Sequence, residues 1–235
     1  VQDILAQLEQ SDETVRSYQA KPTGFLWLSC MVSFGEQLLL PVLDEFKTLY
    51  PDIILDVSLS DELSTLSRDE IDIAIRGGYA PNERVQAVRL MDNEFILTAA
   101  SSYLAAAGTP ENATEIRQHQ GIFFRTPVGP QPWLCELDGQ WLDVSAQALA
   151  ISNNGKWLAE QAIAGKGIMM APRWLVQGFL DSGELQELMI KPTLRVSQNH
   201  NPAIHLLYQK QQYAVPKVKA AVDFFVARLR DSPSP

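Results

Sequence analysis

The feature that most constrains the fold is a regular alternation of short apolar stretches with longer amphipathic ones. In the segment LSCMVSFGEQLLLPVLDEFKTLYPDIILDVSLSD, one apolar strand pattern ends at Cys30 and a second begins at Ile53, with a helical pattern between them. The elements predicted for this part of the chain are strands at 25–30, 53–59 and 71–75 and helices at 36–50 and 61–70. This βαβαβ order predicts a parallel sheet with helices packed on its faces.

A second set of strand and helix patterns follows the first. It predicts strands at 94–100, 121–124, 149–152 and 167–171, helices at 101–107, 112–118, 155–164 and 172–181, extended segments at 185–190 and 203–209, and a last helix at 217–230. The helix at 172–181 is expected to start with Pro172, whose missing amide hydrogen costs nothing in a first turn. Two such sets favour an α/β protein of two lobes with one cleft, where ligands bind beyond the carboxyl ends of parallel strands.

Charge and composition exclude several classes of function. The chain of 235 residues has a formal net charge of −9, so it offers no positive surface on which a nucleic-acid backbone or an anionic membrane would bind. No apolar run is long enough for a membrane span or signal peptide. The two cysteines, Cys30 and Cys135, do not suggest a disulfide framework, which favours a reducing cytoplasm; the alternative is one disulfide between them in an oxidising compartment.

The turn after the first strand carries the sequence Ser33-Phe34-Gly35-Glu36, which permits two interpretations. As a capping box, the serine hydroxyl accepts from an amide three residues later, and this is the favoured interpretation. As a ligand site, the same hydroxyl and the free amides of a helix start hold an anionic group. Pro41 is expected to separate a short first turn from the main helix.

Three more strand ends carry polar groups suited to a ligand. Arg76 with Gly77, at the end of the third strand, could pair with a carboxylate, or could form an ordinary turn with a surface arginine. Arg125 and Thr126 follow another apolar strand. Asn153 and Asn154 precede a helix, and we expect at least one of them to cap it.

Signatures of enzymes and metal sites are missing from the sequence. There is no G-x-S-x-G elbow, H-E-x-x-H pair, Walker loop or C-x-x-C motif, and the three histidines lack metal-ligand spacing. We therefore predict no enzyme activity, no metal and no cofactor.

Several segments, in order and with similar spacing, resemble the effector-binding region of LysR-type bacterial transcriptional regulators. They are VSFGEQLLLPVLDEFKTLYPDIILDVSLSD, IDIAIRGG, SSYLAAAGTPENATEI, Trp133-Leu134 with Asp138-Gly139, SNNGKWLAEQAIAGKGIMMAP and VPKVKAAVDFF, and together they span about 24–229. Glu70 departs from the pattern, because glycine is common there, and this is expected to alter only a helix end.

The resemblance implies a periplasmic-binding-protein-like fold of type 2, with two α/β lobes joined by two crossing strands. It implies lobe I at 24–95 plus 201–230, lobe II at 96–200, the end of a linker helix at 1–20 and a disordered tail at 231–235. Effector-binding positions carried over by motif are Ser33, Phe34, Ser60, Arg76, Gly77, Arg125, Thr126, Asn153 and Asn154. The implied ligand is a small, possibly anionic effector in the inter-lobe cleft.

The resemblance also implies partners. They are a second copy of the chain in a homodimer or homotetramer, and promoter DNA reached only through an N-terminal winged helix-turn-helix that this sequence does not include. The alternatives are a solute-binding protein of a transport system and, less favoured, a small-molecule enzyme. The stripe Ile4, Leu8, Ser11, Val15 and Tyr18 argues against the first, because it marks a helix that seeks a partner.

Overall fold

The computed structural model describes residues 21–62, 71–78 and 83–230, and these fall into two compact units. Unit 1 comprises the described residues of 21–31, 38–91 and 204–230, and unit 2 comprises 32–37 and 92–203. The predicted linker helix at 1–20, most of the predicted helix at 61–70 and the tail at 231–235 lie outside the described residues. The lobe boundaries expected from the resemblance stay a prediction.

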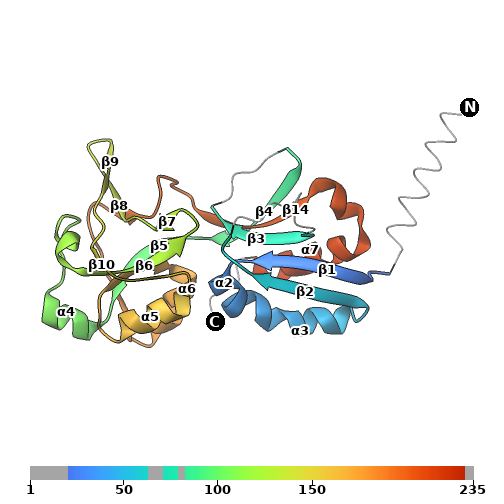
Figure 1. Ribbon diagram of the computed structural model, residues 1–235, viewed down its shortest axis with the longest axis horizontal. Coiled ribbons are helices and arrows are strands. Elements are labelled where there is room, and N and C mark those ends of the chain that lie inside the picture. The colour runs from blue at the N-terminus through green and yellow to red at the C-terminus, as the bar shows by residue number, and fades with distance from the viewer. Residues whose placement is uncertain (1–20, 63–70, 79–82, 231–235) are drawn as a thin grey trace, which may run out of the picture. The chain divides into compact units, whose positions relative to one another are not determined.

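Unit 1 is built on a five-stranded sheet in the order β2-β1-β3-β14-β4 (Figure 1). Its strands are β1 (Gly24–Cys30), β2 (Ile53–Leu59), β3 (Ile73–Gly77), β4 (Val85–Asp92) and β14 (Ala203–Gln209). Strands β2 and β3 run parallel to β1 on either side of it, and β14 is antiparallel to β3. The predicted parallel pairing of β1, β2 and β3 is confirmed, as is the helix between β1 and β2, whereas β4 was not expected from the sequence.

The helices of unit 1 bury aromatic side chains. Helix α3 (Leu40–Leu49) and helix α7 (Pro216–Leu229) meet at Phe46, which stacks on Phe225 (centroids 5.1 Å apart) and meets Phe224 edge to face (5.2 Å). A 3-10 turn, η3 (Lys210–Ala214), precedes α7. All three phenylalanines are buried, so this contact stabilises the packing of α7 against α3.

The chain between β1 and α3 is helical earlier than predicted. It forms α2 (Val32–Phe34), then a π-helical turn η1 (Gly35–Leu39), then α3 with Pro41 in its first turn. The π-helical turn is explained by Pro41, which has no amide hydrogen to donate to the carbonyl four residues before it. Pro41 lies at the start of the main helix as expected, but the residues before it are helical without a break and do not form a separate short turn.

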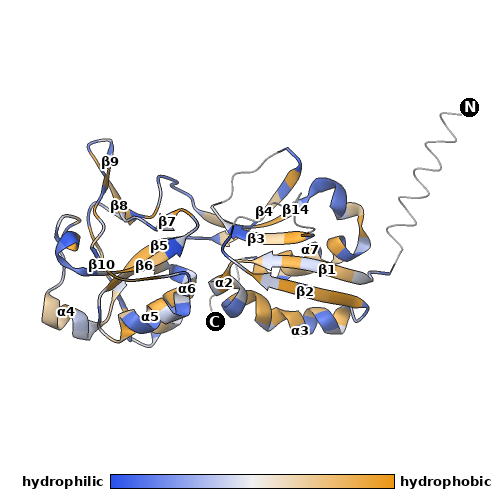
Figure 2. Ribbon diagram, in the orientation of Figure 1, coloured by the Kyte–Doolittle hydropathy of each residue, from blue (hydrophilic) through white to orange (hydrophobic). Residues whose placement is uncertain are grey.

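Unit 2 contains a sheet in the order β10-β6-β11-β5-β12, with the short strand β7 paired to β6. The strands are β5 (Phe95–Ala99), β6 (Gln120–Thr126), β7 (Gly129–Pro130), β10 (Gln147–Ser152), β11 (Ile168–Pro172) and β12 (Gln186–Glu187). Strands β10 and β11 are parallel to β6, and β5 is antiparallel to β11. Hydrophobic residues run along the strands of both units, where the cores lie (Figure 2).

Two helix predictions for unit 2 need correction. Its helical elements are α4 (Ser101–Ala107), η2 (Glu115–Gln118), α5 (Gly155–Ile163) and α6 (Arg173–Asp181). Pro172 does not start α6, because its ψ of 136° is extended and it is the last residue of β11. The predicted helix at 112–118 is only a 3-10 turn, whose first amides bond the Asn112 side chain.

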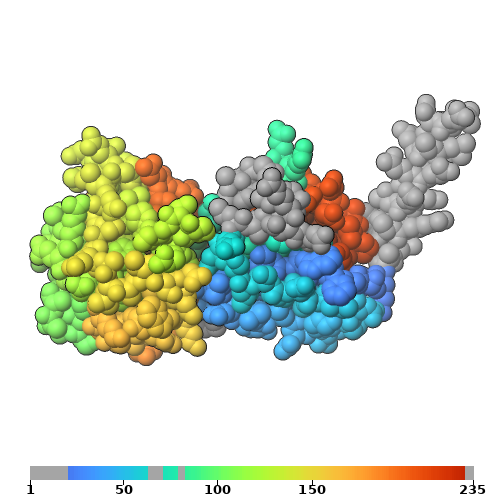
Figure 3. Space-filling model, in the orientation of Figure 1, coloured from blue at the N-terminus to red at the C-terminus, as the bar shows by residue number. Residues whose placement is uncertain are grey.

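A small separate sheet completes unit 2. It pairs β8 (Leu134–Leu137) with β9 (Gln140–Asp143) and β13 (Leu194–Arg195). The β8–β9 turn has positive φ at Asp138 (50°) and Gly139 (75°), as a type I′ hairpin requires. The hairpin stands out from the rest of unit 2 (yellow-green in Figure 3), while Trp133 just before it is buried against Phe123.

Candidate functional site

The carboxyl ends of the three parallel strands of unit 1 form one polar edge. Cys30 at the end of β1 lies opposite Leu59 of β2 and Ile75 of β3. The residues that directly follow, Ser60 and Arg76 with Gly77, therefore come to the same edge of the sheet. We call these residues together with Ser29 the unit 1 edge.

Arg76 is the only charged side chain among the buried residues of the described chain, with 6% of its surface exposed. Its guanidinium donates to Ser29 Oγ (2.6 Å), the Ile75 carbonyl (2.9 Å) and the Glu62 carbonyl (3.5 Å). Burial lowers the pKa of Arg76, and the negative charge of the Asp61 carboxylate opposes that shift. Arginine nevertheless stays protonated in proteins, so a positive charge is fixed at this edge.

The other groups of the unit 1 edge tie its loops to the sheet. The Ser60 amide donates to the Cys30 carbonyl (2.8 Å), and Ser60 Oγ accepts from the Glu62 amide (3.2 Å). The Gly77 amide lies 3.1 Å from Met31 Sδ. Burial raises the pKa of the Cys30 thiol far above its usual range, so this cysteine is neutral beside Arg76.

In unit 2 the neighbouring strands β6 and β10 end side by side, with Phe124 opposite Ser152. Arg125 is exposed, unlike Arg76. The Thr126 hydroxyl donates to the Gly129 carbonyl (2.8 Å) and accepts from the Val128 amide (3.3 Å), so it closes the turn between β6 and β7. We call Arg125, Thr126, Asn153, Asn154 and Ser33 the unit 2 edge.

Asn154 caps the following helix. Its Oδ1 accepts from the Trp157 amide (2.9 Å), and its own amide donates to Ser152 Oγ (3.1 Å). The expectation that one of the two asparagines is a helix cap is confirmed for Asn154. Asn153, directly before it, is exposed.

Ser33 makes a contact that the sequence did not predict. Residues 32–37 pack with unit 2, and Ser33 Oγ accepts from the Gly155 amide (3.1 Å) at the start of α5. The capping-box interpretation is wrong because Ser33 lies inside α2 instead of preceding a helix. A Cβ on Gly155 would lie 2.5 Å from Ser33 Oγ, so only glycine allows this approach.

Phe34 is fully buried and meets the edge of the Trp174 ring, with centroids 5.5 Å apart at 75°. Trp174 Nε1 donates to Asn93 Oδ1 (2.9 Å), and Gln37 Nε2 donates to the Trp174 carbonyl (3.3 Å). This packing fixes the segment that carries Ser33. The sequence analysis singled out neither Trp174 nor Asn93, and no local pattern marks either residue.

Eight of the nine predicted residues thus lie at one of the two edges, and the ninth, Phe34, is buried against Trp174. Unit 1 brings together Ser60, Arg76 and Gly77, and unit 2 brings Ser33 to the end of β10 beside Asn154. Ser29 was missed, although a serine within an apolar strand was a usable signal. Among the described residues, no three His, Cys, Asp or Glu side chains are grouped as a metal site, and no helix is long and apolar enough to cross a membrane.

The two α/β sheets, with polar groups at the ends of their parallel strands, define the class: a periplasmic-binding-protein-like fold of type 2. Residues 19–230 match the family model described as the LysR substrate binding domain. The chain therefore belongs to this family and is the effector-binding domain of a LysR-type regulator.

Curated relatives agree with this assignment. The chain is 27% identical over 226 residues to the HTH-type transcriptional activator TtdR of Escherichia coli strain UTI89, covering 96% of this chain and 71% of TtdR. It is 26% identical over 228 residues to the HTH-type transcriptional regulator CrgA of Neisseria meningitidis, covering 97% of this chain and 75% of CrgA.

Solved structures of LysR-type regulators share the fold. A structure of CrgA from Neisseria meningitidis aligns with a TM-score of 0.77 at 25% identity, over 97% of this chain and 76% of that one. Full-length AphB of Vibrio cholerae aligns with a TM-score of 0.75 at 21% identity, over 97% and 76%, which supports the fold alone.

Proposed function

We propose that this domain senses a small anionic effector, with the Arg76 guanidinium as the group that binds its negative charge. The observation that carries the proposal is the position of Arg76: a buried positive charge at the carboxyl end of a parallel strand, held by Ser29 and the Ile75 carbonyl. A guanidinium that is already oriented loses little freedom when it pairs with a carboxylate.

The remaining edge residues have supporting roles in this proposal. Ser60 and Gly77 offer a hydroxyl and close backbone approach beside Arg76. In unit 2, Arg125 supplies a second, solvent-exposed cation, and Ser33, Thr126, Asn153 and Asn154 supply hydroxyl and amide groups. Phe34 acts indirectly, because it is buried against Trp174 and so anchors the segment that carries Ser33.

Signalling follows from differential binding. An effector that binds one conformation of the domain better than another shifts their populations, typically by about 1 to 3 kcal/mol. In the regulator this shift would change how a homodimer or homotetramer presents an N-terminal winged helix-turn-helix to promoter DNA. Both the oligomer and the cytoplasmic location are inferred from the kinship with transcriptional regulators, as is the absence of enzyme activity.

The regulator can be tested directly with DNA. The full-length protein is incubated with promoter DNA and a panel of small carboxylates in a gel-shift assay. A carboxylate-dependent change in a sequence-specific shift supports the proposal. Turnover of the carboxylate, or binding with no effect on any DNA complex, would contradict it.

Replacing Ser33 tests the unit 2 edge. Ser33→Ala removes the acceptor of the Gly155 amide, so we expect a loss of about 1 kcal/mol in stability. We also expect weaker effector binding in a calorimetric titration, with the fold retained by circular dichroism. Unchanged affinity would leave Ser33 as a packing residue only.

A further inference from the structure

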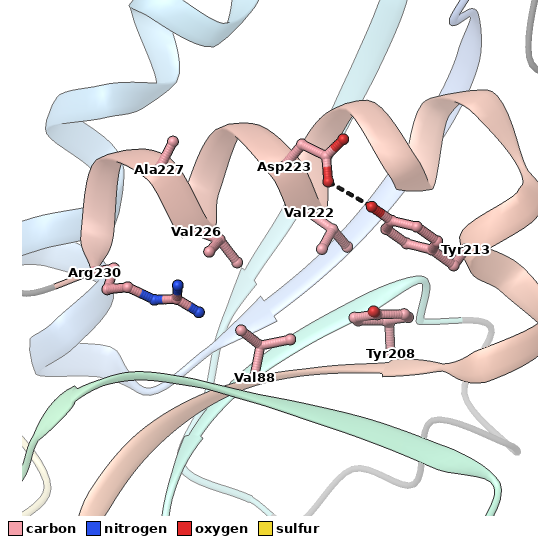
Figure 4. Close-up of a pocket in the computed structure, with 8 residues that line it drawn as sticks. All are labelled: Val88, Tyr208, Tyr213, Val222, Asp223, Val226, Ala227 and Arg230. Carbon is pink, nitrogen blue, oxygen red and sulfur yellow. Dashed lines mark hydrogen bonds between the residues drawn. The ribbon is translucent and has the colours of Figure 1, made fainter.

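Unit 1 contains a cavity of about 570 Å³ that is separate from its strand edge. It lies between α7 on one side and strands β4 and β14 on the other, and Figure 4 shows the side chains that line it. Its walls are Val88, Val222, Val226 and Ala227, and its polar groups come from Tyr208, Tyr213, Asp223 and Arg230. This volume is within the range of small-molecule sites.

At one end of the cavity, the Asp223 carboxylate already has hydrogen-bonding and ionic partners within the protein. Asp223 accepts a hydrogen bond from the Tyr213 hydroxyl (2.7 Å) and pairs with Lys219. The Tyr213 ring stacks on Tyr208, with centroids 5.4 Å apart at 29°. The carboxylate is therefore neutralised from within the protein, and the two stacked rings lie together at this end of the cavity (Figure 4).

The basic end is different. The Arg230 side chain reaches along the cavity toward Val88 (Figure 4), and no carboxylate of the described residues forms an ion pair with it. By contrast Arg228, on the same helix, is paired with Glu45. An open guanidinium favours a planar anion such as a carboxylate.

The spacing along α7 sets the length of the cavity. Asp223 and Ala227 are four residues apart on one face of α7, and Arg230 directly follows the last residue of the helix. A step of seven positions, from Asp223 to Arg230, corresponds to about 10 Å along a helix axis. A ligand that reaches from the tyrosine rings to Arg230 therefore needs a flat apolar body as well as an acid group.

We propose that this cavity is a second ligand site, which binds aryl-alkanoate acids with the carboxylate on Arg230 and the ring against Tyr208, Tyr213 and the valines. The site is distinct from the unit 1 edge and does not use Arg76. It adjoins β4 and β14, at whose ends the chain passes between unit 1 and unit 2 at positions 91/92 and 203/204. A ligand bound here stabilises the ends of both strands, so the site can modulate the response to the effector.

The test is a calorimetric titration of the chain with 3-phenylpropanoate, compared with the neutral 3-phenylpropanamide. We expect saturable binding of the acid and at least tenfold weaker binding of the amide. Arg230→Gln should weaken acid binding at least tenfold, because the guanidinium is lost. Val226→Trp, which fills the cavity and keeps Arg230, should also abolish binding.

Two control variants, each altered outside the cavity, test whether the acid binds in the cavity or at another arginine. Arg228→Gln removes a neighbouring cation outside the cavity and should leave the affinity unchanged. Arg76→Lys should leave it unchanged as well, which distinguishes this site from the proposed effector site. The proposal is overturned if the unmodified chain shows no saturable binding of the acid, or if either Arg230→Gln or Val226→Trp binds it as tightly as the unmodified chain.

Discussion

The strand edges of the two units carry similar kinds of side chain but hold them differently. In unit 1, Arg76 is buried and bonded to the neighbouring strand through Ser29. In unit 2, Arg125 is exposed, while Thr126 closes a turn and Asn154 caps a helix. The candidate binding side chain of unit 1 is thus fixed by hydrogen bonds within the sheet, whereas Thr126 and Asn154 of unit 2 stabilise a turn and a helix start. Substitutions at the two edges should therefore differ in their effect on stability.

The largest effect is expected from removing the buried arginine. Arg76→Ala loses hydrogen bonds from a charged group, leaves the Ser29 hydroxyl unpaired and creates a cavity, so we expect a loss of about 2 to 4 kcal/mol in the free energy of unfolding. Arg125→Ala should change it by less than about 0.5 kcal/mol, because the side chain is exposed. Urea unfolding of both variants measures the contrast, and equal losses would refute it.

The next effect concerns the close approach of Ser33 to α5. In Gly155→Ala the new Cβ would lie 2.5 Å from Ser33 Oγ and 2.9 Å from Leu175 Cδ2, so we expect a loss of about 1 to 3 kcal/mol. In the double variant Ser33→Ala/Gly155→Ala part of this loss should be recovered, because the hydroxyl that clashes is gone. Strictly additive losses in this double-mutant cycle would mean that the two residues do not interact.

A smaller loss is expected at the cap of α5. Asn154→Ala leaves the Trp157 amide without its acceptor, at a cost of about 1 kcal/mol. Asn154→Asp keeps an acceptor oxygen at the helix start and should restore most of the stability. Thermal unfolding followed by circular dichroism compares them, and the cap assignment fails if aspartate and alanine behave alike.

The smallest effect is a pH dependence located in unit 2. Burial lowers the pKa of His119, whose Nδ1 lies 3.2 Å from the Tyr103 hydroxyl. Just below the ordinary imidazole pKa of about 6.5, the unfolded chain binds this proton more readily than the folded one, so stability falls as the pH decreases. In His119→Gln, the free energy of unfolding should depend less on pH between about pH 7 and pH 5. An unchanged slope would show that His119 does not cause this pH dependence.

The sequence predicted those parts of the fold that depend on local pattern. Apolar runs and turn residues placed β1, β2 and α4 at or within one residue of their bounds, since burial and backbone propensity act over a few residues. Strand β4 was missed, because its mixed sequence VQAVRLMD carries no clear alternation. Its pairing depends on distant partners, which local reasoning does not capture.

The same limit applies to the site. The strand ends and their polar residues were found from the sequence because parallel strands place their carboxyl ends at one edge. The role of Ser33 was misjudged, since its partner Gly155 is 122 residues away and the sequence offers only the nearby Glu36. Likewise, whether an arginine is buried, as Arg76 is, or exposed, as Arg125 is, depends on tertiary packing.

The central claim is that the preorganised guanidinium of unit 1 recognises the effector. The ligand is chosen first: it is the carboxylate that most raises the melting temperature in a metabolite screen and that Arg230→Gln binds as tightly as the unmodified chain does. The most direct measurement is then a calorimetric titration of the unmodified chain and of Arg76→Lys with this carboxylate. Because lysine keeps the charge but loses the planar fork, the account predicts at least tenfold weaker binding by Arg76→Lys. Equal affinity for the two chains would contradict it.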